Sequence, residues 1–331
     1  MDEGLKLNGE TPHIATAKSV DWTALHSTTA TSQHKYPSEQ VASCIQTNAR
    51  FVDIGEILSS DPLDDQQLTG LVFDNNHSWA AQFAEKCKEG GRKVFVDPQD
   101  SQMFYLVGSS ESSGVTTVLK VKRRNLRDNL DIYVENVFLM HKNVSRALDV
   151  RSLLPQGKKS PRLSMATETK TAEDDQYVEF AYSPGTNSLL FTEIRNSAGI
   201  TRLLHECGHV WAHYYNIGPK ITPNARKAGY DALVEVERHG LQVVVEEIVQ
   251  VFASERIANM LGEQLAKQSE IREQFGDLLT AGWKTQQTTR YFNRYVQPLL
   301  AKYPTVSAEI EQKVSTILAT VVASHRLEKS L

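Results

Sequence analysis

One eleven-residue stretch constrains this chain more than any other, because it places two histidines four residues apart within an apolar run. It reads Leu203-Leu204-His205-Glu206-Cys207-Gly208-His209-Val210-Trp211-Ala212-His213. Residues four apart lie on the same face of an α-helix, so His205 and His209 point in the same direction. Two neutral imidazoles on one face can supply two ligands of a tetrahedral Zn²⁺ site.

Glu206 follows His205 round this predicted helix and lies beside the position that the metal leaves open. A carboxylate there can take a proton from water whose pKa the zinc lowers. The alternative is an ordinary amphipathic helix that carries two solvated histidines. Apolar residues wrap most of the helix, however, so we expect it to be buried, and buried histidines need partners. The pattern therefore favours a metal site.

The motif His205-Glu206-x-x-His209 resembles that of the HExxH zinc metallopeptidases, the zincins. The metzincin branch continues with a glycine and a histidine three and six residues later, where this chain has Ala212 and Tyr215. The other large branch, the gluzincins, takes its third ligand from a glutamate on a later helix. The resemblance covers roughly residues 190–260 and implies a gluzincin-like zinc peptidase that acts on a protein or peptide.

The third zinc ligand is open among several downstream glutamates. Glu246 and Glu247 lie side by side in an apolar run, where two carboxylates are costly unless one of them is compensated. Gluzincin-like second helices often read glutamate, three residues, then a polar or acidic residue, with an aromatic at six. That layout favours Glu246, with Gln250 and Phe252. Glu255 is a further candidate, with Arg256 as an ordinary ion-pair partner.

Hydrolysis also needs a donor for the oxyanion that develops at the attacked carbonyl. By the same resemblance, His239 and Tyr230 are the candidates, although each is equally well explained as a capping or packing residue. His213 is turned about 80° from His205 on the helix, so we interpret it as a supporting or surface residue.

Strand patterns dominate the middle of the chain. Alternating or apolar runs predict strands at 93–97, 103–107, 115–121 and 131–138, with a hairpin turn at Gly114. A second hairpin, 177–181 and 188–194 around Ser183-Pro184-Gly185, leads into the helix of the motif. In the zincins a strand ahead of this helix lies at the sheet edge and pairs with extended substrate. The resemblance therefore implies Leu189–Thr192 as backbone contacts, although an ordinary strand explains them as well.

Helical spacing governs the rest of the chain. The helix of the motif is expected to run from about Asn196 or Ser197 to Asn216. A second helix from about Asn224 should break at His239-Gly240, and a third should cover Leu241 to Leu265. We therefore predict an α+β, zincin-like fold in which a small mixed β-sheet packs on the HExxH helix and a mainly helical C-terminal half follows.

Three segments are expected along the chain. Residues 1–40 are predicted to be a flexible leader, 41–195 an α/β part with the sheet, and 196–331 a helical part that carries the zinc site. The last two together are expected to form one catalytic domain. The leader resembles the N-terminal segments of effectors exported by specialised bacterial secretion systems, a signal that is compositional only.

Composition narrows the partners and the location. A net charge of −4 and a pI near 6.2 argue against nucleic-acid binding. No apolar run is long enough for a membrane span, and the N-terminus lacks an ordinary signal peptide. Three cysteines without ligand-like spacing fit a reducing compartment. We expect a cytoplasmic protein, or one exported without an ordinary signal peptide, even into a host cell.

The expected activity is zinc-dependent hydrolysis of peptide bonds, with His205, His209 and Glu246 as ligands and Glu206 as general base. A housekeeping peptidase and an exported effector or toxin both fit this activity. One alternative is a non-enzymatic zincin-like domain that binds metal or peptide without turnover. Another is a purely structural helical protein without a metal.

Overall fold

The structure is a computed structural model of the full chain. It describes residues 45, 49–64, 66–67, 91–100, 102–110, 113–126, 129–141, 146–157, 160–165, 180–191, 199–220, 232–279 and 296–325. The chain divides into two units, 1–37 and 38–331, and all described residues belong to the second. The predicted leader over residues 1–40 therefore lies outside the described residues, and so does the export signal inferred from it.

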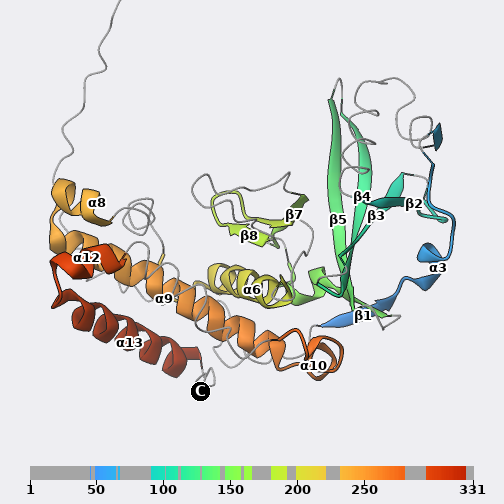
Figure 1. Ribbon diagram of the computed structural model, residues 1–331. Coiled ribbons are helices and arrows are strands. Elements are labelled where there is room, and N and C mark those ends of the chain that lie inside the picture. The colour runs from blue at the N-terminus through green and yellow to red at the C-terminus, as the bar shows by residue number, and fades with distance from the viewer. Residues whose placement is uncertain are drawn as a thin grey trace, which may run out of the picture. The chain divides into compact units, whose positions relative to one another are not determined.

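The strands form a single mixed sheet (Figure 1). Its central path is β2-β3-β4-β5-β7-β9-β8, and β6 joins β1 to β5. All pairs are antiparallel except β7 with β9, which is parallel. The strands are β1 (Arg50–Asp53), β2 (Lys93–Val96), β3 (Met103–Ser110), β4 (Val115–Leu126), β5 (Asn129–His141), β6 (Arg146–Asp149), β7 (Arg162–Met165), β8 (Phe180–Ser183) and β9 (Ser188–Phe191).

The four strands predicted in the middle of the chain are confirmed as β2 to β5, with longer bounds for β3, β4 and β5. Gly114, in the turn between β3 and β4, has a φ of +66°, which a residue with a side chain rarely adopts. Along β3, Phe104 and Leu106 pack into one core, whereas Tyr105 packs into another. This alternation follows from the two-residue period of a strand, and both faces of the sheet here are covered.

The second predicted hairpin is also confirmed, as β8 and β9 around the turn 184–187. The expected place of its second strand is wrong, because β9 lies inside the sheet between β7 and β8. Its backbone is paired on both sides, so Leu189–Phe191 cannot offer a free edge to a substrate. Thr192 lies outside the described residues. Of the strands with described residues, β8 is the one at the sheet edge on this side.

Among the described residues, the helices with complete bounds follow the sheet, apart from two short ones within its part of the chain. They are α3 (Gly55–Leu58), the 3₁₀ helix η1 (Val150–Leu153), α6 (Gly199–Tyr215), α8 (Ala232–His239), α9 (Leu241–Ala266), α10 (Ser269–Phe275), α12 (Gln297–Lys302) and α13 (Val306–His325). The structure thus confirms the α+β class. Among the helices that it describes, none combines the length and apolar character that a membrane crossing needs.

The predicted helix ends are confirmed where the structure describes them. Helix α6 ends at Tyr215, and the next residue, Asn216, has a positive φ of 53° that terminates the helix. Gly240, with a φ of +87°, separates α8 from α9 as expected. The predicted starts at Asn196 or Ser197 and at Asn224 lie outside the described residues.

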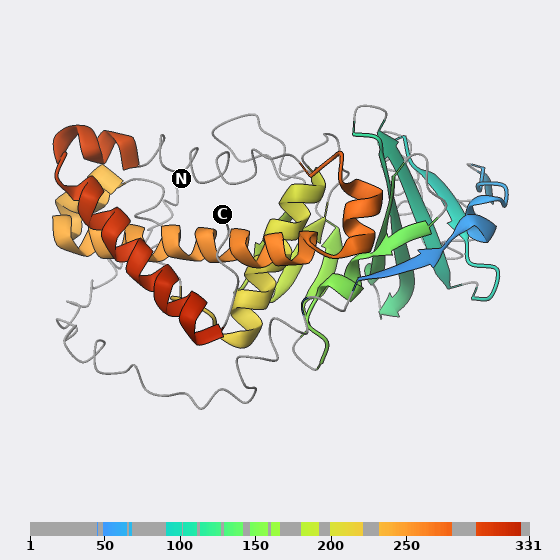
Figure 2. The same ribbon diagram turned by 90° about the horizontal axis from the view of Figure 1, so that it is seen from below.

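Helix α6 packs between the sheet and α9. Its buried side chains share one hydrophobic core with the strands and with α9, among them Leu163, Leu189, Phe191, Leu203, Leu204, Cys207, Ile257 and Leu261. The first half of α9 belongs to a second core with α8, α12 and α13. Helices α6 and α13 lie on opposite sides of α9 (Figures 1 and 2).

Candidate metal centre

The two histidines of α6 are arranged as the sequence predicted. His205 and His209 stand one turn apart, with ring centroids separated by 4.7 Å and ring planes nearly perpendicular at 87°. Their Nε2 atoms approach to 3.1 Å. His205 is only 1% exposed, because the helix is buried between the sheet and α9. Two nitrogens therefore face the same small space at the α6–α9 contact.

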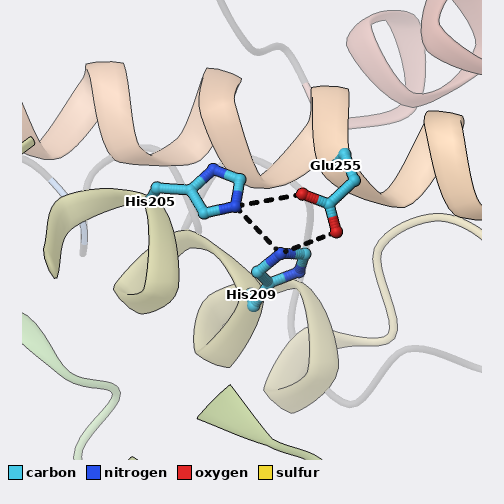
Figure 3. A group of neighbouring side chains, drawn as sticks. All are labelled: His205, His209 and Glu255. Atoms are coloured by element: carbon cyan, nitrogen blue, oxygen red, sulfur yellow. Dashed lines mark hydrogen bonds and ion pairs between the residues drawn. The ribbon is translucent and has the colours of Figure 1, made fainter. Parts of the chain in front are cut away.

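The third member of this group is Glu255 of α9 (Figure 3). Its Oε2 lies 3.2 Å from His205 Nε2, and its Oε1 lies 3.4 Å from His209 Nε2. One ligand atom from each of the three residues lies within 4.8 Å of the others. The described residues thus bring two imidazoles and one carboxylate together, a donor set that can hold a divalent metal ion.

The spacing of the two histidine nitrogens suits a tetrahedral ion. Ligand bonds of about 2.0–2.1 Å at tetrahedral angles place neighbouring ligand atoms about 3.3 Å apart. The Nε2–Nε2 distance of 3.1 Å is close to that value, and a different oxygen of Glu255 approaches each nitrogen, Oε2 at 3.2 Å from His205 and Oε1 at 3.4 Å from His209. The three side chains could therefore hold a metal ion.

Asn259, one turn after Glu255, sets the orientation of the first histidine. Its Oδ1 lies 2.7 Å from His205 Nδ1 in a buried contact. Because an amide oxygen only accepts, Nδ1 carries the proton and donates it. In the neutral ring Nε2 is then the nitrogen with the lone pair, and this atom faces His209 and Glu255.

Charges at the centre reinforce one another. Burial by itself lowers the pKa of His205, but the Glu255 carboxylate, with Glu206 and Asn259, raises it to about 9. Burial raises the pKa of Glu255, but His209 and His205 outweigh it and hold that pKa well below its usual range. Without a metal, the carboxylate is therefore charged and a proton on His205 neutralises it.

Glu206 lies on the side of α6 that faces β8. Its Oε2 accepts a hydrogen bond of 2.7 Å from the backbone N–H of Tyr182. Burial raises the pKa of Glu206, and the two histidines and this N–H only partly oppose the rise. A carboxylate with a raised pKa next to the imidazoles of His205 and His209 is suited to accept and return a proton.

The structure does not bring Glu246, the expected third ligand, to the two histidines. Glu246 precedes Glu255 by nine residues, which puts it about 13 Å away along α9 and on about the opposite face of the helix. It contacts Lys313 of α13 and, at 3.3 Å, Gln242. The helix phase thus turns Glu246 toward α13 while Glu255 faces α6.

Glu247, the second candidate, also lies away from the histidines. It is buried, with 6% of its surface exposed, and burial raises its pKa. His239 and Glu235 at the end of α8 are the charged groups that act on it. Its burial, which suggested a metal from the sequence, belongs instead to the packing of α8 on α9.

The structure does not place His239 at the centre. Its Nε2 pairs with Glu235 Oε2 at 3.3 Å, and the helix from Leu241 to Glu255 separates it from the two histidines of α6 by about 20 Å. The structure thus does not bring the predicted oxyanion donor to these histidines. Tyr230 lies outside the described residues.

His213 is exposed on α6, and the centroid of its ring lies 5.8 Å from that of Tyr182 in an edge-to-face contact, as expected for a supporting residue.

Sequence reasoning missed two residues at this centre, Asn259 and Tyr182. A signal for Asn259 was present, because the layout of glutamate, three residues and a polar residue also fits Glu255 and Asn259. The aromatic preference at six pointed away from it, since that position is Leu261. Tyr182 contacts Glu206 through its backbone N–H, and the type of residue at a position does not reveal a backbone contact.

Comparisons with protein-family models, with curated proteins and with solved structures found no match to this chain.

Proposed function

We propose that this chain is a zinc-dependent peptidase of the zincin type, with a gluzincin-like ligand set. The observation that carries the proposal is the meeting of Glu255 with both Nε2 atoms of His205 and His209. The resemblance of the His205-Glu206-x-x-His209 motif implies a third ligand from a glutamate on a later helix, and α9 brings Glu255 to that position. Asn259 supports the assignment, because it directs Nε2 of His205 toward the ligand group.

The proposed reaction is hydrolysis of a peptide bond in a protein or peptide substrate. Zinc, when bound by His205, His209 and Glu255, supplies a Lewis acid that polarises the carbonyl and lowers the pKa of water. Glu206 accepts the proton of the attacking water and then delivers it to the leaving amine. Its raised pKa brings it closer to the operating pH, which favours both halves of this transfer.

The experiment compares the zinc-loaded parent with Glu206→Gln. Glutamine keeps the size of the side chain and can still accept from Tyr182, but it cannot take up the proton. We expect about one zinc per chain in both proteins and loss of turnover only in the variant, by roughly 100-fold or more. Hydrolysis is followed on a mixture of quenched-fluorescent peptides.

His213→Ala is the matched control on the same helix, since His213 is exposed and is not one of the metal-binding residues. It should retain zinc and activity. Zinc binding without turnover in the parent would instead support a non-enzymatic metal-binding domain. Parent protein that binds no zinc would overturn the proposal itself.

A further inference from the structure

The carboxylate of Glu206 is held by the backbone of β8, not by a side chain. Tyr182 N–H donates to Glu206 Oε2 over 2.7 Å, at the short end of the normal range for a backbone N–H. Among the strands that the structure describes, β8 is the outermost on this side of the sheet. Tyr182 stands opposite Leu189 of β9, and its N–H turns away from that strand toward α6. This donor is therefore independent of the sheet's own hydrogen bonds.

The side chain of Tyr182 makes contacts of its own, separate from the backbone N–H. Its hydroxyl donates to Asn187 Oδ1 at 2.9 Å, across the turn that joins β8 to β9. Its ring packs edge-on against His213 at 5.8 Å. Glu206 and His213 are seven residues apart, so they lie within about 20° of each other around α6. Tyr182 thus contacts one stripe of α6 at two points.

We infer that the backbone N–H of Tyr182 is a positioning group for the general base. It occupies Oε2 of Glu206 and prevents rotation of the carboxylate, so that Oε1 is the oxygen that takes the proton. Without the N–H, the side chain has several staggered rotamers, only some of which point a free oxygen toward the histidines. The inference rests on the proposed function, because it assigns the base in that reaction.

Proline at position 182 removes this donor selectively. Proline has no N–H, and at an edge strand it is tolerated where the N–H does not pair within the sheet. We expect Tyr182→Pro to keep about one zinc per chain and to lower kcat by roughly 10- to 100-fold while KM changes less than about twofold. A loss confined to kcat indicates that the base is misplaced and that substrate binding is intact.

Two variants distinguish the effect of the backbone N–H from that of the Tyr182 side chain. Tyr182→Phe removes only the hydroxyl bond to Asn187, and Tyr182→Ala removes the ring as well, but both keep the N–H. Both should retain kcat within about threefold of the parent. Equal losses in Tyr182→Ala and Tyr182→Pro would assign the effect to the side chain and overturn the inference.

A second readout does not depend on turnover. The electronic spectrum of Co²⁺-loaded protein reports the surroundings of the ion, and we expect Tyr182→Pro to shift it in the same way as Glu206→Ala. Tyr182→Phe should leave it unchanged. A Tyr182→Pro spectrum identical to the parent's would overturn the inference, whereas a parent that hydrolyses no peptide would overturn the proposed function instead.

The folding of the proline variant is checked by its zinc content and thermal unfolding. If it does not fold, Glu206→Asp replaces it, because the shorter side chain cannot both reach the Tyr182 N–H and lie beside the histidines. That variant should show the same shift of the Co²⁺ spectrum. An unchanged spectrum in Glu206→Asp would also count against the positioning role.

Discussion

Asn259 Oδ1 lies 2.7 Å from His205 Nδ1, and this contact determines which nitrogen of His205 faces Glu255. An imidazole that donates from Nδ1 presents Nε2 as a ligand, and a hydrogen-bonded partner also holds the ring in place. The contact joins α6 and α9 at the same level as the ligands. It therefore couples the packing of the two helices to the geometry of the candidate metal centre.

Replacement of Asn259 by leucine should weaken zinc binding by about 10- to 100-fold, because Nδ1–H loses its acceptor and the ring loses its orientation. Competition with a chelator of known affinity measures the change. Asn259→Asp keeps an acceptor and should bind zinc at least as tightly as the parent. Equal weakening in both variants would show that the contact does not orient His205.

Two glutamates on opposite faces of α9 give a matched test of the third ligand. Glu255→Gln should lower zinc affinity by more than about 100-fold, since an amide is a poor substitute for a ligating carboxylate. Glu246→Gln, which only alters contacts with α13, should bind zinc like the parent. Zinc retained in the first variant and lost in the second would reverse the assignment.

A glycine permits the close approach of α6 and α9. A Cβ at Gly208 would lie 2.1 Å from the carbonyl oxygen of Ala258, so the helices must separate to accommodate it. Gly208→Ala should therefore lower the free energy of unfolding by about 1–3 kcal/mol and weaken zinc binding. The control is Gly185→Ala in the hairpin turn, where a Cβ meets no atom within 4 Å. Urea unfolding with and without zinc measures both effects, and parent-like behaviour of Gly208→Ala would contradict the packing.

Zinc affinity should keep rising with pH above the range in which an ordinary histidine loses its proton. The pKa of His205 in the metal-free protein is raised to about 9, so below that pH zinc must displace a proton. Apparent affinity should increase by about tenfold per pH unit up to about pH 9 and then level off. Chelator competition between pH 6 and pH 9.5, corrected for the chelator's own protonation, checks this. An affinity that is flat above pH 7 would contradict it.

Asp97 should make the stability of the sheet sensitive to acid. Burial raises its pKa, but hydrogen bonds from Gln99 N–H and the Tyr105 hydroxyl, with the Lys120 charge, lower it overall. A carboxyl group whose pKa is lower in the folded than in the unfolded state stabilises the protein above its unfolded pKa of about 3.9. This stabilisation is lost as the pH falls through the folded pKa. Asp97→Asn should therefore be destabilised at pH 7, and its deficit should shrink as the pH falls below the unfolded value. Urea midpoints measured from pH 7 downward test this, with exposed Asp61→Asn as the control.

The sequence by itself determined the local features of this protein. Four-residue spacing places His205 and His209 on one face of α6, and two-residue alternation predicts strands β2 to β5. Positive-φ positions such as Gly114 and Gly240 end elements where the sequence suggested. Each of these features depends on residues close together along the chain, so a period or a turn residue is sufficient to reveal it.

Only the tertiary structure decided which distant residues meet. Glu246, Glu247 and Glu255 are all glutamates of one helix, and the rotation of α9 against α6 turns Glu255 toward the two histidines. Gly208 lies against Ala258, and Gly262 lies against Leu204, so both glycines permit the close approach of the two helices in this orientation. Likewise, the pairing of β9 with both β7 and β8 leaves β8 outermost among the described strands on this side and brings the N–H of Tyr182 to Glu206. A backbone donor is present in almost every residue, so only the fold determines which one acts.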